Sequence, residues 1–186
     1  MDYTGFSDKE LVALFQGGAG EYYYEIVSRY EKGLYQFIFS FTDSHRETDQ
    51  VLREVFLKAY RHLDAGEEIA NFRVWFFRLA VDTLAHKRGE PIGNSAFLEN
   101  GVEKIVQEAQ LGEGAERTRL FAALKLLPEE YRLVFVLRDV NKFSTKEVAD
   151  VLNLKSAMVR AQLHRARLML LKNIRNNSDS TSPNVV

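Results

Sequence analysis

The chain has 186 residues, a formal net charge of −1 and 46% hydrophobic residues, so it is long enough for one domain or two small ones. It contains no cysteine, which excludes disulfides and thiol chemistry. Its first residues are polar and acidic, unlike a secretory signal, and no apolar run approaches the roughly 20 residues that span a bilayer. These features favour a cytoplasmic protein without membrane insertion.

The small net charge hides an asymmetry along the chain. Residues 119–186 hold 12 basic and six acidic side chains, whereas residues 1–118 hold 13 basic and 20 acidic ones. Six of the basic side chains lie between Lys155 and Arg175, a stretch without any acidic residue. Clustered positive charge suits a polyanion, so this end of the chain is the candidate nucleic-acid-binding part.

Helical periodicity runs through almost every segment, and strand-like alternation is nowhere sustained, so we predict an all-α fold. Ser-x-x-Glu capping boxes predict helix starts at Ser7, Ser44 and Ser144. In chain order, the predicted helices span residues 7–16, 21–41, 44–63, 71–88, 115–126, 129–140, 144–152 and 156–175.

The composition changes at Gly89. Residues 89–114 hold five of the 11 glycines, and residues 91–114 hold four glutamates against a single lysine. We predict a flexible linker at 91–114, with a short helix near 96–110, between helical modules at 1–90 and 115–176. The polar residues 177–186 are predicted to form a disordered tail.

Residues 144–175 are predicted to form two helices joined by a tight turn at Asn153-Leu154. The first helix is short and apolar, and the second is long and cationic, as in a helix-turn-helix that presents a reading helix to the DNA major groove. Ser156 is the predicted cap of the second helix. Its predicted buried stripe is Val159, Leu163 and Ala166, which leaves Arg160, Gln162, His164, Arg165 and Arg167 off the stripe to contact DNA.

In the amino-terminal module, a helix rich in aromatic residues has the 3–4 spacing of a core helix. Its predicted core residues are Tyr23, Ile26, Val27, Tyr30, Leu34, Phe37 and Ile38. Further along, Trp75 and Phe76 have flat faces on which an extruded base could stack, worth roughly 1–3 kcal/mol per base. The alternative for Trp75 is a buried core residue.

Residues for catalysis or metal binding are not apparent in the sequence. There is no phosphate-binding glycine loop after a strand, and the four histidines are dispersed without His-Glu-x-x-His spacing. We therefore expect no enzymatic activity, no cofactor and no metal site.

Several strings resemble the extracytoplasmic-function (ECF) sigma factors of the sigma-70 family. LPEEYRLVFVLRDV, STKEVADVLNL and VRAQLHRARLMLLKNI are similar to region 4 of that family, and the LHRAR string at Leu163–Arg167 is the most specific part. REVFLKAYRHL and NFRVWFFRLA are similar to region 2. The resemblance implies a sigma region 2 helical bundle and a sigma region 4 helix-turn-helix, joined by the linker.

The resemblance implies a sigma factor that directs promoter recognition, DNA melting and transcription initiation. Duplex DNA would be bound by Lys155, Ser156, Met158, Arg160, Gln162, His164, Arg165 and Arg167. The melted element would be bound by Asn71, Arg73, Trp75, Phe76, Arg78, Lys87 and Arg88. Polymerase would be bound by Asp49, Gln50, Arg53, Glu54 and Leu57. The implied partners are core RNA polymerase, through its β′ clamp helices and β flap, promoter DNA and an anti-sigma factor.

The sequence departs from the family pattern at a few positions. Lys142 stands where the family usually has glycine, Met158 where it has threonine, and Asp82 and His86 where it has asparagine and aspartate. Two alternatives are open. The first is a stand-alone helix-turn-helix regulator. The second is a degenerate sigma homologue that acts as a protein-binding antagonist, which the departures at Met158, Gln162, Asp82 and His86 leave open.

Overall fold

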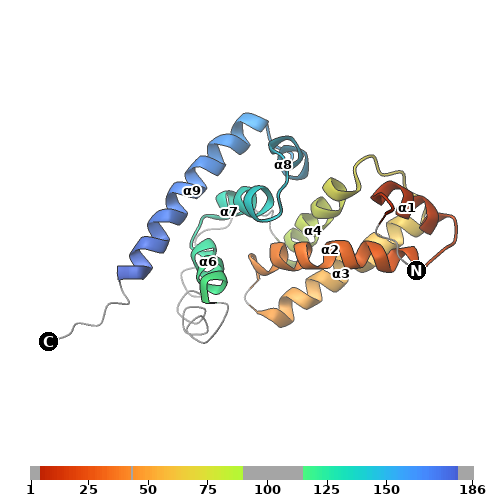
Figure 1. Ribbon diagram of the computed structural model, residues 1–186, viewed down its shortest axis with the longest axis horizontal. Helices are drawn as coiled ribbons and strands as arrows, with labels where there is room; N and C mark the ends of the chain where they lie inside the picture. The colour runs from red at the N-terminus through yellow and green to blue at the C-terminus, as the bar shows by residue number, and fades with distance from the viewer. Residues whose placement is uncertain (1–4, 43, 90–114, 180–186) are drawn as a thin grey trace. The chain divides into compact units, whose positions relative to one another are not determined.

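The computed structural model describes residues 5–42, 44–89 and 115–179, and the regular elements in these ranges are all helical (Figure 1). They divide into two compact units. One contains α1–α4, and the other contains α6, α7, η1, α9 and most of α8. The all-α prediction is confirmed, whereas the predicted linker at 91–114, with its helix near 96–110, lies outside the described residues. No helix in the described ranges is long and apolar enough to cross a bilayer.

The amino-terminal unit consists of α1 (Asp8–Gln16), α2 (Tyr22–Phe39), α3 (His45–Asp64) and α4 (Phe72–Arg88). Ser7 begins α1 with a complete capping box, in which its side chain accepts from the Glu10 amide and its own amide donates to the Glu10 carboxylate. Ser44 caps α3 in the predicted way. Gly89 ends α4 with φ 72°, a left-handed conformation that glycine adopts readily.

One face of each of these four helices forms the core of the amino-terminal unit. The predicted core residues of α2 are buried from Ile26 onward, except Val27. Tyr23 and Val27 are only half-buried, because they lie on the edge of α2 that borders a surface groove. Each fully buried leucine, isoleucine or phenylalanine contributes roughly 1.5–3 kcal/mol. The buried partners on the other helices include Leu11, Phe15, Val51, Val55, Ala59, Phe72, Phe76 and Leu84.

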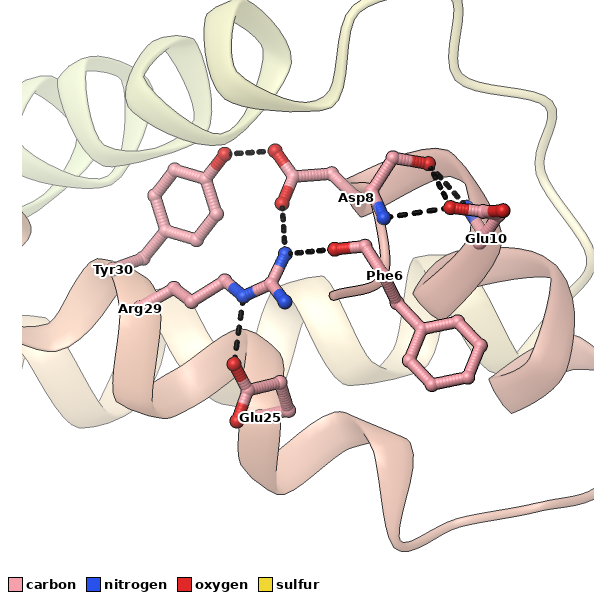
Figure 2. A network of polar contacts seen from close by, with 7 residues as sticks. Phe6, Asp8, Glu10, Glu25, Arg29 and Tyr30 are labelled. Carbon is pink, nitrogen blue, oxygen red and sulfur yellow. Dashed lines mark hydrogen bonds and ion pairs between the residues drawn. The ribbon is translucent and has the colours of Figure 1, made fainter. Parts of the chain in front are cut away.

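A polar network fastens α1 to α2 (Figure 2). Arg29 of α2 donates to the Phe6 carbonyl at 2.7 Å and to the Asp8 carboxylate at 3.2 Å. Its Nε donates to Glu25 at 2.7 Å. The Tyr30 hydroxyl donates to the other Asp8 oxygen, and burial together with this hydrogen bond raises the pKa of Tyr30. The network therefore holds the start of α1 in a defined position on α2.

The carboxy-terminal unit contains α6 (Ala115–Lys125), α7 (Glu129–Phe135), η1 (Val136–Val140), α8 (Thr145–Leu152) and α9 (Ser156–Asp179). The single helix predicted at 129–140 is divided, because its last five residues form the π-helical turn η1. Val136 accepts from the Asn141 amide at 2.9 Å, and the Asn141 side chain donates to the same carbonyl at 3.1 Å. The wider turn accompanies burial of five consecutive apolar residues, 133–137.

The helix-turn-helix consists of α8 and α9, as predicted. Ser144 caps α8 with a complete capping box. Asn153 ends it in the left-handed conformation, at φ 53°, which asparagine tolerates. The amide of Val159 donates to Lys155 at 3.1 Å, so α9 is capped at Lys155 and Ser156 is its first residue, not its cap.

The buried stripe of α9 is confirmed at Val159, Leu163 and Ala166, and it continues to Leu170. The helix runs to Asp179, beyond the predicted end at Arg175, because no glycine or proline interrupts it. The predicted tail at 177–186 therefore begins within α9, and its residues 180–186 lie outside the described part of the chain.

Candidate functional site

The exposed face of α9 begins at its amino-terminal end. Lys155, Arg160 and His164 are exposed there, and Met158 is 51% exposed. Arg160 and His164 are four residues apart, so they lie on one side of the helix, away from the buried stripe. This end of α9 therefore offers positive charge and hydrogen-bond donors to a ligand.

Gln162 does not share this exposure, although the sequence predicted it on the same side as Arg160. The residue is half-buried, and its side-chain oxygen is enclosed without a hydrogen-bond partner. The cause is its position beside Val159, Leu163 and Ala166, the buried stripe. Gln162 therefore cannot present its full amide to a base edge in this conformation.

Arg165 and Arg167 connect α9 to other helices of the same unit. Arg167 makes a bidentate ion pair with Asp139 of η1, with N–O distances of 2.8 and 2.7 Å. These hydrogen bonds raise the pKa of Arg167 and neutralise its charge locally. Arg165 donates to the Tyr131 hydroxyl at 3.3 Å. Both arginines are exposed, as expected for side chains off the buried stripe, and the structure also gives both of them partners within the fold.

The docking residues predicted on α3 form a continuous surface. Asp49, Gln50 and Arg53 are exposed, and Leu57 is 53% exposed. Glu54 is half-buried and pairs with Lys58 at 2.8 Å. All five side chains lie at or near the outer face of one helix, where a second protein could bind them.

Beside this surface lies the α2–α3 groove, a pocket of about 370 Å³. Tyr23, Val27 and Glu31 line it from α2, and Asp49, Leu52, Arg53, Phe56, Leu57 and Tyr60 line it from α3. The sequence predicted only Asp49, Arg53 and Leu57 as binding residues. The i, i+4, i+8 spacing of Tyr23, Val27 and Glu31 was a signal for a shared face, but its apolar part was assigned to the core.

Aromatic contacts make one end of the α2–α3 groove rigid. The Tyr23 hydroxyl donates to the Phe56 carbonyl at 2.5 Å, and burial raises the pKa of Tyr23. The rings of Tyr23 and Tyr60 meet edge to face at 5.2 Å, and each also contacts Phe15 of α1. Three helices therefore converge on this end of the groove.

The aromatic residues predicted to stack on a base differ in exposure. Phe76 is fully buried between Tyr30, Phe56 and Phe72, so it has no free face for a base and the prediction that it stacks on one is wrong. Trp75 is half-buried, so part of its ring stays accessible. Its ring packs against Phe72 and Phe76, and against His62 of α3.

The loop between α3 and α4 is held beside Trp75. Glu67 pairs with His62 at 2.7 Å, and its carbonyl accepts from Gln16 of α1 at 3.0 Å. At the end of the loop, Asn71 caps α4 by accepting from the Val74 amide at 3.1 Å. Asn71 therefore has a structural role, whatever it binds in addition.

The predicted phosphate-binding cations of α4 are dispersed along the helix. Arg78 is exposed, and Arg73 is half-buried near the start of the helix. Lys87 lies 3.8 Å from Glu47, and Arg88 donates to the Phe41 carbonyl. Both residues near the end of α4 thus support the connection between α2 and α3. In the described ranges, no three His, Asp or Glu side chains gather as a metal site.

Comparisons with known proteins cover both units. The family described as "Sigma-70, region 4" matches residues 117–170. The chain is 24% identical over 182 residues to the ECF RNA polymerase sigma factor SigW of Bacillus subtilis (strain 168), covering 90% of this chain and 96% of SigW. It is 28% identical over 174 residues to the ECF RNA polymerase sigma-E factor of Escherichia coli (strain K12), covering 87% and 91%.

Among solved structures, CnrH in complex with the cytosolic domain of CnrY has a similar fold. The TM-score is 0.68, with 24% identity over 94% of this chain and 99% of the matched one. The likeness therefore extends over both units.

Proposed function

We propose that this chain, which belongs to the ECF sigma factors of the sigma-70 family, directs RNA polymerase to promoters, separates the DNA strands and initiates transcription. The observation that carries the proposal is similarity along almost the whole chain to ECF sigma factors, together with the cationic helix-turn-helix of α8 and α9. Its chemistry would be recognition and strand separation, not catalysis. The chain would act in the cytoplasm, together with the polymerase.

Duplex promoter DNA is assigned to the start of α9. In a helix-turn-helix, the first turns of the second helix enter the major groove. Lys155, Ser156, Met158, Arg160 and His164 occupy these turns, and arginine can donate two hydrogen bonds to guanine. Arg165 and Arg167 would hold α9 against the rest of its unit through Tyr131 and Asp139.

Core polymerase is assigned to two surfaces. The first is the outer face of α3, which would bind the β′ clamp helices through Asp49, Gln50, Arg53, Glu54 and Leu57. The second is the later part of α9, where two large apolar side chains, Leu168 and Leu171, are 56% and 61% exposed. They suit an apolar contact with the β flap, because exposed apolar patches commonly mark interaction sites.

The melted promoter element is assigned to α4 and the loop before it. The accessible part of Trp75 can stack on a base, and Arg73 and Arg78 can approach phosphates. Base flipping costs a few kcal/mol, which stacking and phosphate contacts must offset.

Control by an anti-sigma factor is the remaining part of the proposal. The fold neighbour CnrH was solved with a bound protein, the cytosolic domain of CnrY, which supports a protein partner for this chain as well.

Permanganate footprinting of promoter DNA tests the proposal, because permanganate oxidises thymines that are unpaired. With cognate core polymerase, the chain should expose thymines near the transcription start, and core polymerase alone should not. A double variant, Arg53→Glu with Glu54→Arg, should lose this footprint and core binding while remaining folded, since surface changes usually alter stability by less than about 0.5 kcal/mol. A footprint that never forms would reject the assigned function.

A further inference from the structure

We propose that His62 and Glu67 are positioning residues for DNA strand separation. Together they hold the loop between α3 and α4 beside Trp75, so that the loop and the accessible part of the tryptophan ring form one surface before DNA arrives. Neither residue needs to touch DNA, because both act through Trp75. The inference rests on the proposed function, which assigns the melted promoter element to α4 and this loop.

The way α3 ends brings Glu67 back to His62. The amide of Gly66 donates to the Leu63 carbonyl at 3.0 Å, and the amide of Glu67 donates to the His62 carbonyl at 3.3 Å. Gly66 has a φ of 77°, and these two hydrogen bonds around a left-handed glycine form a Schellman motif. This motif commonly brings apolar side chains together at the positions that His62 and Glu67 occupy. Here it brings together an imidazole and a carboxylate.

Glu67 is held through three different groups, although its side chain is 48% exposed. Besides the bond of its amide, its carboxylate accepts from Nδ1 of His62 at 2.7 Å. Its carbonyl accepts from Nε2 of Gln16, on α1, at 3.0 Å. The next residue, Glu68, is exposed and makes no ion pair within the part of the chain that the structure describes. The loop is therefore fixed at Glu67, to α3 and to α1.

The imidazole of His62 also contacts Trp75. The two rings meet edge to face, with their centroids 5.9 Å apart. One imidazole thus touches both the loop and the ring that is assigned to base stacking. A surface formed in advance binds more tightly than one that is ordered on binding, because less conformational freedom is lost.

The ion pair suits a local role more than a stabilising one. The side chains of His62 and Glu67 are 41% and 48% exposed, and exposed ion pairs add little to the stability of a fold. Removing either side chain should therefore leave the amino-terminal unit folded and leave its binding to core polymerase unchanged.

Permanganate footprinting over time, with the full chain and cognate core polymerase, measures the rate of strand separation. Glu68→Ala is the matched reference, because it removes the same charge from the same loop without removing an ion pair. Glu67→Ala should separate the strands about threefold to tenfold more slowly than Glu68→Ala, within the range of coupling between residues in contact. His62→Ala should be slowed by a similar factor.

A double-mutant cycle determines whether Glu67 acts through Trp75. Trp75→Leu removes the flat ring, so adding Glu67→Ala to it should cause little further loss, whereas a merely structural role would give the same loss in both backgrounds. Trp75 is also the single tryptophan of the chain, so the fluorescence of the free chain reports on this ring alone. Glu67→Ala should make that fluorescence more susceptible to quenching by acrylamide, and Glu68→Ala should not.

The outcomes separate this inference from the proposed function. Equal rates of strand separation in Glu67→Ala and Glu68→Ala would overturn the positioning role, and so would an equal loss from Glu67→Ala in the Trp75→Leu background. If the wild-type chain gave no footprint, the proposed function would be rejected. The quenching of the free chain would still decide whether Glu67 holds Trp75 in place, and unchanged quenching in Glu67→Ala would show that it does not.

Discussion

Lys142 occupies a backbone conformation that glycine would adopt at lower cost. Its φ of 59° lies in the left-handed region, which costs a residue other than glycine roughly 1–2 kcal/mol. The Lys142 ammonium donates to the Asp139 carbonyl at 2.7 Å, which offsets part of that cost. Glycine, which ECF sigma factors usually have at this position, would adopt the turn between η1 and α8 without that cost.

Replacing Lys142 by glycine should stabilise the chain slightly. Glycine removes the left-handed strain, but it also loses an exposed hydrogen bond and makes the unfolded chain more flexible. Because the first effect is the largest, we expect the free energy of unfolding to rise by about 0.5 kcal/mol. Lys146→Gly is the matched control, because it places glycine in the first turn of α8, where φ is not positive, and it should destabilise the chain. Urea unfolding measures both. Destabilisation by Lys142→Gly would show that its backbone is not strained.

Arg160 and Arg167 should differ when each is replaced by alanine. Arg160→Ala should cost roughly 1–3 kcal/mol of promoter binding and relax the preference at particular bases, because Arg160 is exposed on the first turns of α9. Arg167→Ala should leave base preference and salt dependence nearly unchanged and cost a few tenths of a kcal/mol of stability, because Arg167 is paired with Asp139. Binding to a promoter pool at several salt concentrations distinguishes them. If both variants lost the same affinity for every promoter sequence, α9 would bind DNA through charge alone, without reading bases.

At the scale of elements, the positions of the helices followed closely from the sequence, whereas some features of their surfaces did not. Serine caps and apolar spacing are local signals, so α1, α3 and α8 begin within one residue of prediction. The π-helical turn η1 depends on how five consecutive apolar residues are buried, which local periodicity does not specify. The α2–α3 groove and the enclosed side chain of Gln162 depend on neighbouring helices and were missed for the same reason.

The free energy of unfolding should fall at high pH, because α2 carries two tyrosines with hydroxyl groups that are hydrogen-bonded within the fold. Burial raises the pKa of Tyr30 and of Tyr23 above the value of about 10 for an exposed tyrosine. Their contribution to stability is complete below pH 10 and is lost as pH rises towards the folded-state pKa, because only the unfolded chain ionises readily.

Tyr30→Phe tests this linkage. The variant should be less stable at pH 8, because the hydrogen bond to Asp8 is lost, but its stability should fall less than that of the wild type between pH 8 and 11. Tyr24→Phe, on the exposed side of α2, should behave like the wild type. Urea unfolding at both pH values provides the comparison, and an equal fall in wild type and Tyr30→Phe would contradict the role of Tyr30.

At the scale of the whole molecule, the two units divide the proposed work. The unit of α1–α4 would carry the α3 docking surface and the base-stacking part of Trp75, and the carboxy-terminal unit would carry the DNA-reading start of α9 and the apolar contact with the β flap. Polymerase binding and duplex recognition are therefore predicted to be separable by substitution. The Arg53→Glu, Glu54→Arg variant should fail to bind core polymerase while keeping the affinity of α9 for duplex DNA. Arg160→Ala should keep the affinity for core polymerase and weaken binding to duplex DNA.

Run-off transcription with purified cognate core polymerase and fragments of the source genome tests the central claim most directly. The account predicts transcripts with defined start sites that depend on the wild-type chain, that disappear with the Arg53→Glu, Glu54→Arg variant, and that weaken or change start site with Arg160→Ala. Absence of any start site dependent on this chain, in a reaction where it binds core polymerase, would contradict initiation and identify the chain as an antagonist.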